Sequence, residues 1–104
     1  MMRIYISGPM TGTQDLNRPL FQRIEDLLRA IGHDPVNPHK LEHPDQEYTK
    51  CLRRDIKALM DCDTLVFLPG SHNSRGANLE MRIAGSVGIP IHDVEVFLGE
   101  VLND

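Results

Sequence analysis

The sequence predicts an α/β domain built on a short parallel sheet of roughly four or five strands. Short runs rich in β-branched residues alternate along the chain with longer stretches in which apolar residues recur at helical spacing. The run 64–68 is apolar without alternation, as expected for a central parallel strand covered on both faces. With 104 residues, 40% of them hydrophobic and 25% charged, the chain has the size and composition of one globular domain, residues 1–104.

The first half of the chain is expected to form a strand, a helix and a second strand. Residues 3–7 combine β-branched and aromatic side chains and lead into a glycine-rich loop. An apolar stripe with helical spacing follows at residues 20–31, with Asn17 as the expected N-cap and Gly32 as the end of the helix. The proline-broken segment 34–38 allows only a brief strand at or near an edge of the sheet.

The second half continues the alternation of helices and strands. We expect two longer helices around the central strand, then a weak strand and a final helix, at residues 44–60, 64–68, 75–87, 89–91 and 94–102. In parallel sheets of this kind ligands bind beyond the carboxyl ends of the strands, where loops lead into helix N-termini. A functional cleft is therefore expected at that edge.

Charge and composition exclude several functions. A formal net charge of −4 argues against a nucleic-acid polymer as partner, and no run approaches the roughly 20 apolar residues of a membrane span. Because no secretory signal precedes the first strand, a cytoplasmic protein is expected. Cys51 and Cys62 are interpreted as reduced thiols. His39 and His43 are flanked by prolines that oppose a shared metal, so neither a metal nor a cofactor is expected.

Two loops combine glycines with hydroxyl residues immediately before a helix, at residues 8–12 and 69–76. In the second loop, Ser74 and the free N–H groups of the following helix are suited to an anion such as phosphate. The alternative is that Ser74 is only an N-cap. Arg75 either adds positive charge to the same pocket or is solvated, and His72 either touches a ligand or is simply exposed.

Acidic residues interrupt the apolar sides of two consecutive helices. Glu80 lies beside Ala84 on its helix, where a buried carboxylate must be partnered, protonated or presented to a ligand. Asp55 breaks the apolar seam of the preceding helix in the same way. If both face inward they meet across the cleft as a nucleophile and an acid, as in glycosyl-transferring enzymes. The alternatives are a solvent-facing Glu80 and an Asp55 paired at the surface with Arg54 or near Lys57. The hydroxyl of Tyr5, near the end of the first strand, either reaches a cleft carboxylate or only packs.

Three segments together resemble the nucleoside 2-deoxyribosyltransferase superfamily: IYISGP at residues 4–9, Asp55 with Asp63 eight residues later, and SRGANLE at residues 74–80. The chain is similar in particular to small phage-associated members of unassigned function. It is also similar to the 2′-deoxynucleoside 5′-phosphate N-hydrolases, in which a serine six residues before the catalytic glutamate binds the nucleotide phosphate. Ser74 and Glu80 have this spacing.

The resemblance extends from residue 4 to about residue 91 and implies a flavodoxin-like or Rossmann-like three-layer sandwich that forms a homodimer or a larger homo-oligomer. It implies that Glu80 is the nucleophile at the sugar C1′, that Asp55 helps the base to leave or holds the sugar, and that Tyr5 hydrogen-bonds the nucleophile. The residues expected to bind substrate are Ser7, Gly8, Pro9, Met10, Ser74, Arg75 and Gly76.

Two positions depart from the family pattern. Arg82 stands two residues after Glu80, where family enzymes commonly have glycine, and is expected to crowd the approach. The loop at 68–70 lacks the aspartate that the transferases carry. The resemblance implies cleavage or transfer at the N-glycosidic bond of a 2′-deoxynucleotide or nucleoside, by a retaining double displacement. The alternatives are a non-catalytic nucleotide-binding or sequestering module of the same fold, and an interaction domain with a relic cleft.

Overall fold

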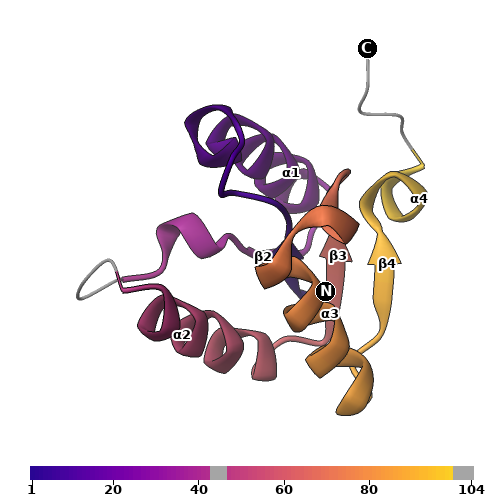
Figure 1. Cartoon of the computed structure of the whole chain (residues 1–104). Coiled ribbons are helices and arrows are strands. Elements are labelled where there is room, and N and C mark those ends of the chain that lie inside the picture. Colours follow the sequence, from indigo (N-terminus) through magenta and orange to yellow (C-terminus); the bar gives the residue numbers. More distant parts are fainter. Residues whose placement is uncertain (43–46, 100–104) are drawn as a thin grey trace.

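A computed structural model describes residues 1–42 and 47–99. Four parallel strands form one sheet in the order β2-β1-β3-β4 (Figure 1). Their bounds are Arg3–Ser7 for β1, Asp34–Val36 for β2, Thr64–Phe67 for β3 and Ile91–Asp93 for β4. The predicted α/β class with a short parallel sheet is confirmed, and β3 has the central position that its unbroken apolar run predicts.

Helices cover both faces of the sheet and give the protein three layers. The bounds of the helices are Arg18–Ala30 for α1, Tyr48–Met60 for α2, Arg75–Ser86 for α3 and Val94–Leu98 for α4. Short 3-10 turns lie at Gln14–Asn17, Pro38–Lys40 and Ser71–Asn73. One core joins α1 and α4 to one face of the sheet, and a second joins α2 and α3 to the other.

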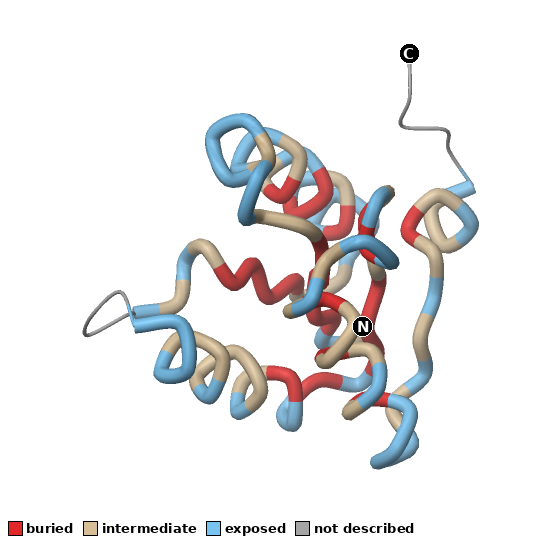
Figure 2. The backbone as a smooth tube through the Cα atoms, in the orientation of Figure 1, coloured by how far each residue is buried: buried red, intermediate tan, exposed pale blue. Residues whose placement is uncertain are grey.

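Alternation along β1 divides its side chains between these two cores. Ile4 and Ile6 pack with Phe21 of α1, whereas Tyr5 packs with Leu59 of α2. All of these side chains are fully buried, and Figure 2 shows buried residues along the inner strands of the sheet, whereas β4 has intermediate and exposed residues. Residues on the face of Tyr5 therefore point toward α2 and α3, which is the side on which the site lies.

The observed element boundaries differ from the predicted ones at several places, and β3 and α3 each end one residue earlier than predicted, at Phe67 and Ser86. Strand β4 begins at Ile91 rather than at residue 89. Helix α2 begins at Tyr48, and its predicted start falls in 43–46, outside the described residues. Helix α4 ends at Leu98, and most of the remainder of its predicted length falls in 100–104, also outside them.

Asn17 occupies the predicted N-cap position of α1, but its side chain does not cap the helix. Its backbone is left-handed, with φ 61°, and its side chain makes no capping bond; instead Nδ2 donates to the carbonyl of Pro9 over 3.0 Å. Asp15 and Leu16 are also left-handed, each with φ 51°. Left-handed backbone costs about 1–2 kcal/mol per non-glycine residue. The chain thus enters α1 through a strained turn that is tied back to the loop after β1.

Other sequence features can be located directly. No helix among the described residues is long and apolar enough to cross a membrane. Within residues 1–42 and 47–99, no three His, Cys, Asp or Glu side chains are grouped so as to hold a metal ion. Cys51 and Cys62 form no disulfide within the described residues. His43 lies outside the described residues.

Candidate active site

Glu80 is carried on the buried side of α3. Ala77, Glu80 and Ala84 are the buried residues of this helix and follow one another at helical spacing. Glu80 is only 5% exposed, so its carboxylate needs partners that replace water. The solvent-facing alternative for Glu80 is therefore excluded.

Two hydroxyl groups from β1 supply those partners. The hydroxyl of Tyr5 donates to Oε2 of Glu80 and the hydroxyl of Ser7 donates to Oε1, each over 2.7 Å. Tyr5 and Ser7 are two residues apart on the same strand, so they share a face and reach the same carboxylate. Both oxygens of Glu80 thus accept a hydrogen bond from a fully buried side chain.

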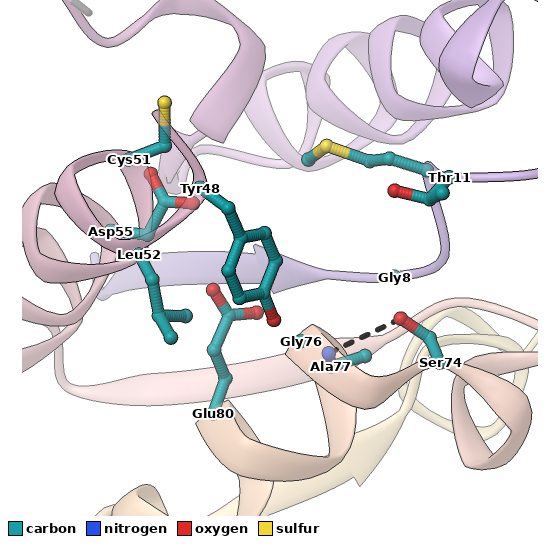
Figure 3. A pocket seen from close by; sticks show the side chains of 11 residues that line it. Gly8, Thr11, Tyr48, Cys51, Leu52, Asp55, Ser74, Gly76, Ala77 and Glu80 are labelled. Carbon is teal, nitrogen blue, oxygen red and sulfur yellow. Dashed lines mark hydrogen bonds between the residues drawn. The ribbon is translucent and has the colours of Figure 1, made fainter. Parts of the chain in front are cut away.

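Asp55 lies on α2, on the opposite side of the pocket from Glu80, and Figure 3 shows both carboxylates directed into the same space. Oδ1 of Asp55 is buried and has no hydrogen-bond partner among the described residues, and the same is true of Nη1 of Arg54. Oδ1 of Asp55 is therefore buried rather than paired with Arg54 at the surface. The predicted convergence of the two acidic residues is observed.

Burial perturbs the ionisation of both carboxyl groups. Burial raises the pKa of Asp55 to about 7, although the charge of Arg54 acts in the opposite direction. Burial also raises the pKa of Glu80 to about 7; the bonds from Ser7 and Tyr5 lower it, and the charge of Asp55 raises it. The pKa of Tyr5 lies well above its ordinary value because of burial and the neighbouring Glu80, so its hydroxyl remains a donor. Near neutral pH one carboxyl can be ionised while the other holds a proton.

The pocket between these groups has a volume of about 150 Å³. The loop that follows β1, helix α2 and the first half of α3 with its N-cap contribute to its wall, which Figure 3 shows from close by. Its lining consists of Gly8, Met10, Thr11, Tyr48, Cys51, Leu52, Asp55, Ser74, Gly76, Ala77 and Glu80. This places the cleft at the carboxyl edge of the sheet, as the parallel topology predicts.

An outer pocket of about 390 Å³ shares part of this wall at the start of α3, and Asn73 and Arg75 extend it. Ser74 caps α3, because its Oγ accepts from the backbone N–H of Ala77 over 3.3 Å. The N-cap reading of Ser74 is therefore correct for its acceptor oxygen. The guanidinium of Arg75 lies 5.4 Å from the ring centre of Tyr48, a cation–π contact across the outer rim.

The predicted site residues occupy three kinds of place. Glu80, Asp55, Gly8, Met10, Ser74 and Gly76 line the inner pocket, and Arg75 lines the outer one. Tyr5 and Ser7 lie behind Glu80 and are closed to the pocket. The backbone of Pro9 anchors the strained turn through Asn17. Arg82 is exposed and lines neither pocket, so the expected crowding does not occur. His72 is exposed and contacts the ring of Phe67.

Three pocket residues on α2 were not singled out from the sequence: Tyr48, Cys51 and Leu52. Helical spacing could have predicted them. They precede Asp55 by seven, four and three residues and therefore share its face of the helix. Gly8 was expected to contact substrate and also has a packing role. A Cβ atom at this position would lie 2.8 Å from Cδ1 of Leu68.

The family model described as a domain of unknown function, DUF4406, matches residues 2–93. The chain belongs to the DUF4406 family. No curated protein matches the sequence of this DUF4406 chain. Solved structures do match it in fold, and they include two 2-deoxyribosyltransferases and an N-glycosidase.

A 2-deoxyribosyltransferase from Bacillus psychrosaccharolyticus has a TM-score of 0.69 and 19% identity over 97% of this DUF4406 chain and 77% of its own. A 2-deoxyribosyltransferase from Leishmania mexicana has a TM-score of 0.70 and 17% identity over 88% of this chain. The CMP N-glycosidase BcmB of Clostridium botulinum has a TM-score of 0.62 and 19% identity over 86% of this chain. The DUF4406 chain spans 62% and 65% of the last two proteins. The resemblance to the nucleoside 2-deoxyribosyltransferase superfamily is confirmed at the level of the fold.

Proposed function

We propose that this DUF4406 protein cleaves, or transfers across, the N-glycosidic bond of a 2′-deoxynucleotide or nucleoside through a covalent intermediate on Glu80. The observation that carries the proposal is the state of the Glu80 carboxylate. It is buried at the wall of a pocket, is held by two hydroxyl donors and faces a second carboxyl group that can carry a proton. The fold shared with deoxyribosyltransferases and an N-glycosidase supports the same chemistry.

The reaction follows from the two carboxyl groups. Ionised Glu80 attacks C1′ of the sugar, the bond from C1′ to the base nitrogen breaks, and its electron pair leaves with the base. Protonated Asp55 donates its proton to the departing base, which is then released as a neutral molecule. Water, or a second base, next attacks C1′ while Asp55 accepts a proton from it, and the C1′–O bond to Glu80 breaks. Both carboxyl groups return to their starting states.

The outer pocket suggests that the substrate carries a 5′-phosphate. The oxygen of Ser74 is used as a cap, but its hydroxyl hydrogen has no acceptor within the described part of the chain and can donate to an anion. The N-terminus of α3 lies at the wall of the outer pocket and favours negative charge there. Arg75 lines the same outer pocket and adds positive charge.

Assembly into a homodimer or larger oligomer stays a prediction.

Free base measured by chromatography tests the proposal. The purified protein and Glu80→Gln are incubated with each deoxynucleoside 5′-monophosphate and each deoxynucleoside. Base released by the unmutated protein and not by Glu80→Gln is expected. Release that persists in Glu80→Gln would refute the role of Glu80. Saturable binding without release by either protein would replace the proposal with the non-catalytic nucleotide-binding module.

A further inference from the structure

Ser7 is closed to the pocket. Its side chain is fully buried at the end of β1, where it pairs in register with Phe67 of β3, and it does not line either part of the cleft. Its hydroxyl donates to Oε1 of Glu80 over 2.7 Å. Because the hydroxyl is buried, lies outside both pockets and is bonded to Glu80, Ser7 acts on the carboxylate and not on the ligand.

Two hydrogen-bond donors, Tyr5 and Ser7, restrain the Glu80 carboxylate more than a single donor would. The terminal torsion of a glutamate side chain has broad minima, so a carboxylate held at one oxygen still rotates about its last bond. Tyr5 bonds one oxygen of Glu80 and Ser7 bonds the other. Two bonds at separate oxygens fix the plane of the carboxylate, and both stabilise its ionised form relative to its protonated form.

We propose that Ser7 is a positioning residue that, together with Tyr5, fixes the orientation of the Glu80 carboxylate and keeps it ionised for attack at C1′. The kinetic part of this inference rests on the proposed function, whereas the ionisation of Glu80 can be measured without any reaction. The titratable groups that face Glu80 are Tyr5 on β1 and, across the pocket on α2, Tyr48, Cys51 and Asp55. Strand β3 contributes apolar side chains to the core around Tyr5.

The deciding experiment measures the titration of the Glu80 side-chain carboxyl carbon by NMR in the full chain, with Glu80→Gln used to assign the signal. Ser7→Ala is expected to raise the pKa of Glu80 by about one to two pH units, the effect of losing one charge-assisted hydrogen bond. The matched control is Ser71→Ala, because Ser71 is also fully buried but donates to the carbonyl of Leu68. Ser71→Ala is expected to leave the titration of Glu80 unchanged.

Turnover provides a second readout. In Ser7→Ala the acid limb of the pH dependence of kcat is expected to move upward by the same amount, with kcat lowered about tenfold or more at pH 6 and KM nearly unchanged. Ser7→Thr, which keeps a hydroxyl, is expected to restore both. An unchanged titration of Glu80 in Ser7→Ala, or an equal shift in Ser71→Ala, would overturn the inference.

The outcomes separate this inference from the proposed function. No base release by the unmutated protein refutes the enzyme activity, while the NMR titration still decides the role of Ser7. If Ser7→Ala does not fold, Ser7→Cys serves instead, because cysteine is similar in size and its thiol is a weaker donor. An intermediate rise in the pKa of Glu80 is then expected, and no rise would count against Ser7.

Discussion

Replacing Glu80 with glutamine is expected to stabilise the protein at alkaline pH. The folded state holds this carboxyl at a pKa of about 7, whereas the ordinary value is 4.5. Below pH 4.5 the group is protonated in both the folded and the unfolded protein and costs nothing. As pH rises from 4.5 to 7 the unfolded chain releases the proton more readily, so the free energy of unfolding falls. Glutamine cannot ionise and avoids this loss.

The size of the effect follows from the two pKa values. A pKa difference of one corresponds to about 1.4 kcal/mol, so the difference between 4.5 and about 7 corresponds to about 3 kcal/mol at full ionisation. The side chain is 5% exposed, so solvent screening reduces this little. In a domain of this size about 3 kcal/mol shifts the melting temperature on the order of 10 °C. The same substitution is expected to end base release.

Urea denaturation at pH 4 and pH 8 measures this effect. The two proteins are expected to match at pH 4, and Glu80→Gln to be more stable at pH 8. Glu25→Gln is the matched control, because Glu25 is equally buried. Burial raises the pKa of Glu25, but bonds from Lys40, Asn37 and Arg29 outweigh it and lower the pKa overall. Glu25→Gln should therefore be less stable at pH 8. A Glu80→Gln protein no more stable than the original at pH 8 would refute the reasoning.

Three further predictions concern other parts of the site. Base release is expected to follow a bell-shaped pH profile centred near pH 7, and Asp55→Asn is expected to remove one limb of this profile. An unaltered profile in Asp55→Asn would show that Asp55 takes no part in the reaction. Ser74→Ala is expected to lower the free energy of unfolding by about 1 kcal/mol and kcat/KM about tenfold more for a nucleotide than for its nucleoside. Equal losses of kcat/KM for the nucleotide and the nucleoside would show that Ser74 caps the helix and does not bind phosphate. In urea denaturation, Gly8→Ala is expected to lower the free energy of unfolding by about 1–3 kcal/mol because its Cβ would crowd Leu68. Gly85→Ala, whose Cβ would make an ordinary contact of 3.8 Å with Cδ1 of Ile91, is expected to raise it by about 0.5–1 kcal/mol. An unchanged stability of Gly8→Ala would contradict the packing argument.

The main features of the site could be predicted because they depend on periodicity. Glu80 and Asp55 stand out as acidic residues on sides of helices that are otherwise apolar, and parallel strands bring the following loops to one edge. The hydroxyl of Tyr5 could be expected to reach a cleft carboxylate because it lies near the carboxyl end of the first strand. These regularities act over a few residues, so they are readable without the fold.

Contacts between distant segments could not be predicted in this way. Ser7 and Glu80 are 73 residues apart in sequence, and only the packing of α3 on the sheet decides that the serine hydroxyl meets the carboxylate rather than a ligand. Asn17 has the residue type of an N-cap, but the left-handed turn before α1 directs its side chain to Pro9. At Asn17 a local preference was overridden, whereas at Ser7 the partner lies too far along the sequence to be predicted.

The close approach of Gly8 to Leu68 affects how variation at this site should be interpreted. A library of variants selected only for folding would already remove other residues from position 8, because any Cβ there meets the side chain of a core leucine. Invariance at Gly8 among related sequences would then report packing and would say nothing about base cleavage. Glu80 behaves in the opposite way, since selection for folding alone would favour its replacement. A glutamate retained at position 80 against that pressure would therefore be a mark of selection for activity.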